Sequence, residues 1–421
     1  MYINENPEYE KETVVLIEEM LRQRIKGMQN EVGAWIPPAF PKLVYVMDDN
    51  NIYKDSKYYY LTELASECIA HRMMPDCISA KNMRKYYEGN VFGPMGCRAF
   101  LAPYKGPVNN VDGKYKWYGR LNMGLTTLNL VDAGLSANKD LDTFWNIMEE
   151  RTELVHRTLK LRFDKLKDVT SDVSPIHWQH GAIARLGKHE PIRPILESPV
   201  TTISMGYIGI YECVEALIGK SNTTPEGEKL ALEIIEFLEN KIKTWKAKDG
   251  LGYALYGTPS ESLTDRVARL AKKKFGVIPG ITDRLFVTNS FHVFVEEPID
   301  AFSKIDFEAK FSRHSLGGHI SYIETPNLGK NLDVIIQLMQ HMYENGIYCE
   351  FNTKLDYCQV CGFDGEIICD DNLNWVCPNC GNRDTDKMNI VRRTCGYLGE
   401  NLWNEGRTSE IKNRVLHIGM E

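Results

Sequence analysis

The chain has 421 residues, which at the usual size of about 150 residues per domain corresponds to two or three domains. Its 43% apolar residues can build a large buried interior, so disordered and fibrous classes are excluded. A formal net charge of −7 excludes a broad cationic surface for nucleic acid or an anionic membrane. No apolar run approaches the roughly 20 residues of a membrane helix, and the first residues lack a signal-peptide core. We therefore expect a soluble, cytoplasmic protein with no membrane or nucleic-acid partner.

The first part of the chain, up to about residue 346, alternates helical patterns with short apolar runs, which is typical of an α/β domain. Residues 42–47 predict a strand. Residues 61–69 have apolar side chains at helical spacing, and Cys68 among them is expected to pack as a small buried hydrophobe. A long amphipathic helix is predicted at about 140–168. Its expected buried positions are Leu141, Phe144, Met148, Val155, Leu159 and Leu166.

Three further segments carry signals for the ends of helices. GKS at 219–221 resembles the end of a phosphate loop, but the glycine-rich cradle is absent, so we interpret it as a turn after a helix. TPSE at 258–261 has the pattern of a capping box with proline at the first helical position, and it predicts a helix towards residue 274. An apolar stripe over 332–342 predicts another helix, which Asn-Gly at 345–346 ends.

The eleven cysteines divide the chain into two parts. In a reducing compartment thiols stay reduced, and clustered cysteines indicate metal binding or catalysis. Five cysteines are scattered through the first 350 residues and six are concentrated near the end. The scattered ones are Cys68, Cys77, Cys97, Cys213 and Cys349, and the concentrated ones are Cys358, Cys361, Cys369, Cys377, Cys380 and Cys395.

Two C-x-x-C pairs, Cys358 with Cys361 and Cys377 with Cys380, predict a tetrahedral zinc site. Four thiolates leave no open position for a substrate, so the zinc is expected to be structural. Cys369 lies between the pairs and is not expected to be a ligand. Residues 358–380 contain four acidic residues and no Lys or Arg, which argues against a ribbon that binds nucleic acid.

Two glycine-rich segments carry the most specific signal in the chain. RRTCGYLG at 392–399 resembles the glycyl-radical loop of glycyl radical enzymes, and GPMGCRAFL at 93–101 resembles the finger loop that holds their thiyl cysteine. With the four-cysteine knot, these segments resemble one family in particular, the anaerobic (class III) ribonucleoside-triphosphate reductases. Further similarity lies in GRLNMG (119–124), TLNL (127–130), HGAIARL (180–186), TTISMGYIGIYE (201–212), YGTPSESLTDR (256–266) and TNSFHV (288–293).

The resemblance implies an α/β fold, the ten-stranded barrel of this enzyme type, with a small C-terminal zinc ribbon and radical loop. We expect the barrel portion at 1–349, the zinc knot at 350–383, and the radical loop with the C-terminal segment at 384–421. Relatives carry a longer N-terminal part with the first barrel strands, regulatory nucleotide sites and a second active-site cysteine. Only 96 residues precede Cys97 here, so these features are expected to be missing. Three explanations fit the short N-terminal part: the chain is half of a split enzyme, a truncated reading frame or a minimal variant.

The resemblance also implies the chemistry. Gly396 would store a radical that a radical-SAM activating enzyme installs with a 4Fe-4S cluster and S-adenosylmethionine. Glycine suits this role, because its Cα carries no side chain and the unpaired electron can spread over the flanking amide and carbonyl groups. The radical would pass to Cys97, and the thiyl would begin the reduction of ribonucleoside triphosphates to deoxyribonucleoside triphosphates for DNA synthesis.

Members of this family use either formate or a thiol protein as the reductant. Asn122 aligns with an asparagine that helps to hold substrate in the formate-using type, and no cysteine follows Cys395 as a redox-active tail. We therefore expect formate, and a homodimer. Other hypotheses are an inactive or split fragment of the reductase, an enzyme of the pyruvate formate-lyase type and a zinc-ribbon binding protein. The lyase has adjacent cysteines where Arg98 follows Cys97, and it lacks the zinc knot.

Overall fold

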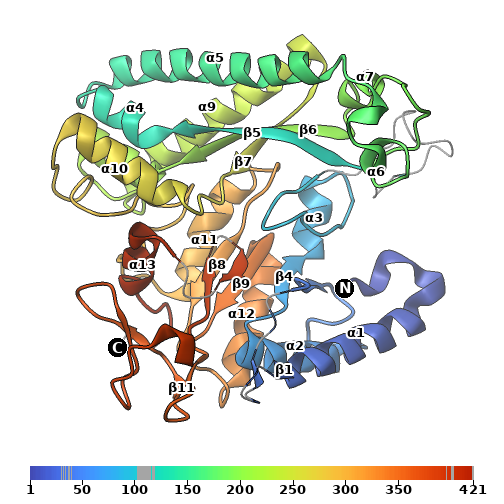
Figure 1. Cartoon of the computed structure of the whole chain (residues 1–421), viewed down its shortest axis with the longest axis vertical. Coiled ribbons are helices and arrows are strands. Elements are labelled where there is room, and N and C mark those ends of the chain that lie inside the picture. Colours follow the sequence, from blue (N-terminus) through green and yellow to red (C-terminus); the bar gives the residue numbers. More distant parts are fainter. Residues whose placement is uncertain are drawn as a thin grey trace.

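The computed structural model describes residues 1–29, 31, 33, 35–36, 38, 40–101, 115, 119–394, 396–399 and 403–419. Two β-sheets lie one above the other, each with helices packed against it (Figure 1). The cysteine-rich C-terminal segment lies beside the lower sheet (Figure 1).

The upper sheet is parallel and has the order β5-β6-β7, with β5 at Leu121–Asn129, β6 at Thr201–Ile208 and β7 at Gly252–Gly257. Every residue of β6 is buried, as expected for a central parallel strand that is covered on both faces. The covering helices include α5 (Leu141–Leu166) and α9 (Pro225–Asp249), as Figure 1 shows. The other helices around this sheet are α4 (Leu130–Ser136), α8 (Ile210–Ile218) and α10 (Leu263–Phe275).

The lower sheet has the order β3-β4-β9-β8, with β3 at Val44–Met47, β4 at Asp76–Ser79, β8 at Ser321–Glu324 and β9 at Tyr348–Asn352. The β4 and β9 strands are antiparallel and the other two pairings are parallel. Its helices pack with the sheet in two apolar clusters. These helices are α1 (Glu10–Lys26), α2 (Tyr59–Arg72), α3 (Ala80–Tyr86), α11 (Ala301–Ser312) and α12 (Leu332–Asn345).

The C-terminal segment is built from short strands around a small core that includes Trp375, Met388 and Ile390. Its antiparallel strands are β10 (Asp356–Cys358), β11 (Asp364–Gly365), β12 (Ile368–Cys369), β13 (Trp375–Val376), β14 (Met388–Asn389), β15 (Arg392–Thr394) and β16 (Tyr397–Gly399), followed by α13 (Glu405–Lys412). The remaining short elements are β1 (Met28–Gln29), β2 (Trp35–Ile36), α6 (Pro175–Trp178), α7 (Arg193–Leu196) and the 3-10 turns Ile3–Glu5, Pro7–Tyr9, Ser171–Val173 and Thr385–Lys387.

Most of the elements expected in the first 350 residues are present, with two corrections. Leu141 is 42% exposed and Leu166 is only half-buried, because the two residues lie at the ends of α5, where the core no longer covers its apolar face. The capping-box prediction at 258–261 was wrong, because α10 begins only at Leu263. Thr258 is instead buried at the end of β7, and its hydroxyl lies 3.1 Å from the hydroxyl of Thr127 on β5. Gly219 does end α8, with a φ of 65°.

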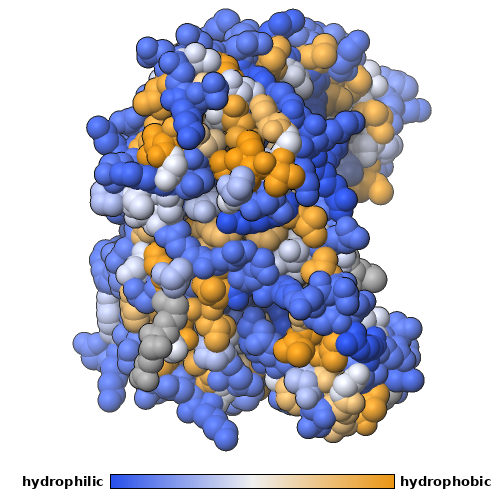
Figure 2. All heavy atoms as spheres, turned by 90° about the vertical axis from the view of Figure 1, so that its left-hand side faces the viewer, coloured by the Kyte–Doolittle hydropathy of each residue, from blue (hydrophilic) through white to orange (hydrophobic). Residues whose placement is uncertain are grey.

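The fold is mixed α/β, as expected, and the described strands of its two main sheets number three and four. An isolated parallel bridge between Tyr256 and Gly318 joins the end of β7 to the segment before β8. On the side of α10 and α13 the surface is largely hydrophilic, with separate apolar patches (Figure 2). None of the helices in the described part of the chain combines the length and the apolar character needed to cross a bilayer.

Candidate active site

Cys97 lies at the tip of a tight loop between the two main sheets. The backbone groups of Met95 and Ala99 pair across it, with N–O distances of 2.7 and 3.2 Å. Gly96 has a φ of 59°, a conformation that favours glycine, so the chain can reverse directly before the cysteine. Ala99 forms a second antiparallel bridge to Gly318, which anchors the loop beside the end of β7. The Cys97 side chain is buried, as a reactive thiol inside a closed site must be.

Gly396 occupies the tip of the hairpin formed by β15 and β16, which we call the Gly396 hairpin. Thr394 pairs with Tyr397, so two residues form the turn, of which Cys395 lies outside the described residues. Gly396 has a φ of 93°. A Cβ added to Gly396 would lie 2.8 Å from the carbonyl oxygen and 3.3 Å from the Cβ of Cys97. Only glycine fits this position, and the two residues predicted to carry the radical are in direct contact.

Two tyrosines contact Cys97 from opposite sheets. The hydroxyl of Tyr256 on β7 lies 3.8 Å from the sulfur, and the hydroxyl of Tyr348 on β9 donates to the Cys97 carbonyl at 3.3 Å. Burial, with the neighbouring Cys97, raises the pKa of Tyr256, so this phenol keeps its proton and can donate it towards sulfur. The loop is therefore held between the upper and the lower sheet.

Lys42, two residues before the start of β3, contacts both loops. Its ammonium group donates to the carbonyl of Cys97 and to the carbonyl of Gly396, both at 2.8 Å. It also forms an ion pair with Asp76 on β4 at 2.8 Å. Burial acts to raise the pKa of Asp76, but Arg393 and Lys42 outweigh it, so the pKa lies below its ordinary value and the carboxylate stays charged.

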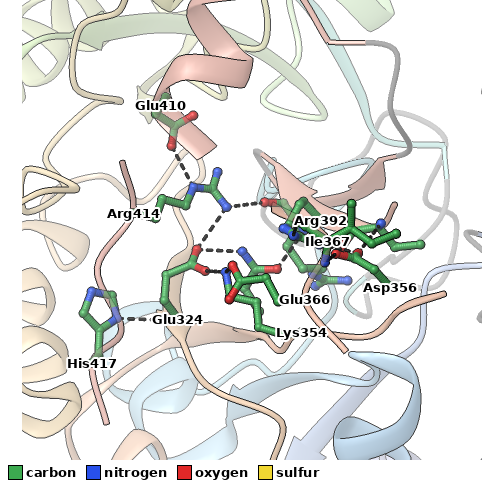
Figure 3. A network of polar contacts seen from close by, with 12 residues as sticks. Glu324, Lys354, Asp356, Glu366, Ile367, Arg392, Glu410, Arg414 and His417 are labelled. Carbon is green, nitrogen blue, oxygen red and sulfur yellow. Dashed lines mark hydrogen bonds and ion pairs between the residues drawn. The ribbon is translucent and has the colours of Figure 1, made fainter. Parts of the chain in front are cut away.

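Buried ion pairs fix the base of the Gly396 hairpin. The guanidinium of Arg393 on β15 pairs with Asp76 and Glu350, and all three side chains are buried. Arg414 donates to the backbone carbonyl of Arg393 at 3.0 Å. Figure 3 shows Arg414 between Glu410 and Glu324, with N–O distances of 3.0 and 2.9 Å. Since charged groups inside a protein must be paired, this network gives the hairpin a defined position.

The four predicted metal ligands come together in the C-terminal segment. The sulfurs of Cys358, Cys361, Cys377 and Cys380 all lie within 4.8 Å of one another, and Cys369 is outside the cluster. Two of the sulfur–sulfur distances are 3.8 and 3.7 Å. The edge of a tetrahedron with zinc–sulfur bonds of about 2.3 Å is about 3.8 Å, so the cluster has the size that zinc requires.

Asp356 connects this cysteine cluster to the Gly396 hairpin. Its carboxylate accepts from the backbone N–H of Ile367, inside the cluster segment, at 2.8 Å. It also accepts from the N–H of Val391 at 2.9 Å and forms an ion pair with Arg392 (Figure 3). The position of β15 therefore depends on the folding of the cysteine-rich segment.

Two further residues from segments that resemble the family, Asn122 and Arg98, have different surroundings. The Asn122 amide donates to the hydroxyl of Ser204 at 2.8 Å and accepts from the N–H of Gly124 at 2.9 Å. No hydrogen bond between described residues joins Asn122 to Cys97 or Gly396. Arg98 is completely buried, and none of its three guanidinium nitrogens has a hydrogen-bond partner among the residues that the structure describes. Burial lowers the pKa of His319 to about 4, and the charge of Arg98 adds to this effect, which places Arg98 in the same part of the interior.

No sequence motif assigned a role to Lys42, Asp76, Tyr256 or Tyr348. Tyr256 lies in one of the segments that carry the family resemblance, which was a usable signal. Lys42 and Asp76 precede or begin apolar strand patterns, and only the tertiary contacts give them a role.

Comparisons with known proteins agree with the geometry. The family model described as "Anaerobic ribonucleoside-triphosphate reductase" matches residues 1–417. Curated proteins of that name are similar to this chain. The Escherichia coli protein is 38% identical over 416 residues, covering 97% of this chain and 57% of its own length. The phage T4 protein is 37% identical over 410 residues, covering 94% of this chain and 65% of its own.

Solved structures give the same result for the fold. A structure titled "Anaerobic ribonucleotide reductase" has a TM-score of 0.65 at 16% identity, covering 97% of this chain and 58% of that chain. The Thermotoga maritima anaerobic ribonucleotide reductase with MES in the active site has a TM-score of 0.62 at 15% identity, covering 94% and 58%. The fold is thus that of the anaerobic ribonucleotide reductases. The chain belongs to the anaerobic ribonucleoside-triphosphate reductase family, and it spans a little more than half the length of the Escherichia coli relative.

Proposed function

We propose that this chain carries the radical centre of an anaerobic ribonucleoside-triphosphate reductase, with the radical stored on Gly396 and the thiyl formed on Cys97. The observation that carries the proposal is the direct packing of Gly396 against the backbone and Cβ of Cys97. Hydrogen transfer needs the reacting groups in contact. The loops that hold Cys97 and Gly396 are about 300 positions apart in sequence, and folding alone does not require that they meet at a glycine.

The proposed reaction balances as follows. The Gly396 radical takes hydrogen from the Cys97 thiol, and the thiyl takes the 3′ hydrogen of the ribose. The 2′ hydroxyl then leaves as water after gaining a proton. Formate is oxidised to carbon dioxide and supplies two electrons and one hydrogen, and the 3′ hydrogen returns from Cys97. The Cys97 thiyl left by this step regains hydrogen from Gly396, which re-forms the stored radical. The sum is a ribonucleoside triphosphate, formate and one proton giving the deoxyribonucleoside triphosphate, carbon dioxide and water.

Formate as the reductant is supported by Arg98. A buried guanidinium without a partner is unfavourable by several kcal/mol, so the site favours a small anion. Arg98 directly follows the thiyl position, and a carboxylate can accept two parallel hydrogen bonds from one guanidinium. A thiol protein as the reductant has no need of such a cation. The substrate-holding role of Asn122 stays a prediction, since its amide is engaged by Ser204 and Gly124.

We further propose that Cys358, Cys361, Cys377 and Cys380 hold a structural zinc ion. The size of the sulfur cluster and its all-thiolate composition support zinc. Because four thiolates would fill the coordination sphere of the ion, the zinc would have no open position for a substrate. We also propose that the two sheets belong to a ten-stranded barrel and that the chain divides into three parts, at about residues 349 and 383. The protein would act in the cytoplasm as a homodimer, and a radical-SAM activating enzyme would be its partner.

The test of the function is product formation under anaerobic conditions. The chain would be activated with a radical-SAM activating enzyme and S-adenosylmethionine, then given a ribonucleoside triphosphate and formate. We expect the deoxyribonucleoside triphosphate and carbon dioxide in equal amounts from the wild type. C97S should retain the Gly396 radical and form no product. Product formation by C97S would contradict the proposal.

A further inference from the structure

We propose that Lys42 is a positioning residue for hydrogen transfer between Gly396 and Cys97, holding the two radical-bearing segments together by their carbonyl groups. The inference rests on the proposed function and assigns a role to a residue that lies outside both loops. Lys42 is 354 positions before Gly396 in sequence, and only the tertiary structure brings it to the site.

The Lys42 ammonium uses all its donors at this one junction. It has three N–H groups, and three acceptors lie at 2.8 Å from Nζ: the carbonyls of Cys97 and Gly396 and the carboxylate of Asp76. The side chain is 11% exposed, and the ring of Tyr348 lies 5.1 Å from the ammonium. A lysine that served only solubility would keep its ammonium group in water, so this burial indicates a specific position.

The anchor of Lys42 belongs to the same network as the Gly396 hairpin. Asp76 accepts from Lys42 on one side and pairs with Arg393 of β15 on the other. The chain of contacts therefore closes on itself, running from the hairpin through Arg393, Asp76 and Lys42 back to the Gly396 carbonyl. Displacement of the hairpin would have to break at least one charge-assisted hydrogen bond of Lys42.

Two chemical effects follow from this arrangement. First, fixing both carbonyls fixes the separation of Gly396 Cα from Cys97, and misplacement of reacting groups by about 1 Å can cost about 10²-fold in rate. Second, an unpaired electron on the Gly396 Cα is shared with the Gly396 carbonyl. An ammonium hydrogen bond at that oxygen draws electron density towards it, so Lys42 should leave a magnetic signature on the radical itself.

The experiment compares wild type, K42M and K42R, with K57M as the matched control. Lys57 also forms an ion pair at 2.8 Å, with Glu10, but its side chain is 67% exposed. Each 421-residue chain would be activated anaerobically in D2O with a radical-SAM activating enzyme and S-adenosylmethionine. Deuterium electron–nuclear double resonance would then detect exchangeable deuterons coupled to the radical. We expect one coupling present in wild type, K42R and K57M to be absent from K42M.

The second measurement is product formed per Gly396 radical, with ribonucleoside triphosphate and formate. K42M should lose about 10²-fold per radical, and K42R should recover part of the loss because arginine can also donate to both carbonyls. If K42M retains the deuteron coupling, or matches K57M in product per radical, Lys42 does not position the transfer. Absence of any radical in the wild type would instead overturn the proposed function. Should K42M fail to fold, K42L, which also has no exchangeable hydrogen on its side chain, carries the same two predictions.

Discussion

At the scale of single residues, the candidate site depends on a close approach that only glycine permits. The positive φ of Gly396 and the 2.8 Å from an added Cβ to the Cys97 carbonyl exclude any side chain. The sequence motifs singled out both residues, and the structure places them next to each other. Their roles as radical carriers stay a prediction. The motifs could not predict Lys42 or Asp76, because an isolated lysine or aspartate acquires its role only from partners that are distant in sequence.

Arg98 provides a test of the reductant. R98Q should raise the KM for formate by about 10- to 10²-fold, since a hydrogen bond to a charged group contributes about 1.5–3 kcal/mol. The KM for the nucleotide should change less, and R98K should be intermediate because it keeps the charge and loses the paired donors. Steady-state kinetics with varied formate measure this. An unchanged formate KM in R98Q, with product still formed, would show that formate does not bind Arg98.

At the scale of elements, the cysteine-rich segment and the Gly396 hairpin form one unit through Asp356. The spacing of the cysteines was sufficient to predict the cluster, because two C-x-x-C turns determine where four sulfurs lie. The start of α10 was not predictable in the same way. The capping-box sequence at 258–261 also fits the end of a strand, and the tertiary contact between Thr258 and Thr127 decided between the two.

Loss of one thiolate should therefore loosen the hairpin. C380S should lose bound zinc and increase amide hydrogen exchange in residues 388–399, because β15 is attached to the cluster segment through Asp356. C369S is the control, since Cys369 lies outside the cluster. Zinc analysis and hydrogen-exchange mass spectrometry measure both effects. If C380S lost zinc while residues 388–399 kept full protection, the coupling through Asp356 would be wrong.

The segment after α13 should make stability depend on pH. His417 accepts a hydrogen bond from the N–H of Glu324 at 2.9 Å, and burial lowers its pKa to about 4. The unfolded chain therefore takes up this proton first as the pH falls below about 6.5, and stability is lost between pH 6.5 and 4.

For this one group the loss between pH 7 and pH 5 amounts to about 2 kcal/mol. H417N keeps an acceptor and cannot titrate, so its free energy of unfolding should fall less over this interval. Urea unfolding at the two pH values measures the difference. If the free energy of unfolding fell equally in wild type and H417N, the pKa of His417 would not be lowered by burial in the folded protein.

At the scale of the whole molecule, the finger loop and the Gly396 hairpin meet where the two sheets approach each other. Tyr256 from the upper sheet and Tyr348 from the lower sheet both contact Cys97. The apolar periodicity predicted the α/β class and the long helices, because each depends on local pattern. The order of strands in the two sheets could not be predicted, since the antiparallel pairing of β4 with β9 joins segments about 270 residues apart.

Electron paramagnetic resonance after anaerobic activation tests directly whether Gly396 carries the radical. The wild type, incubated with a radical-SAM activating enzyme and S-adenosylmethionine, should give a doublet from the one remaining hydrogen on the Gly396 Cα. G396A should give no such signal, and admission of air should cut only the activated wild type, releasing residues 397–421 for mass spectrometry. A folded, zinc-loaded wild type without a radical, or a doublet that persists in G396A, would contradict the assignment of the radical to Gly396.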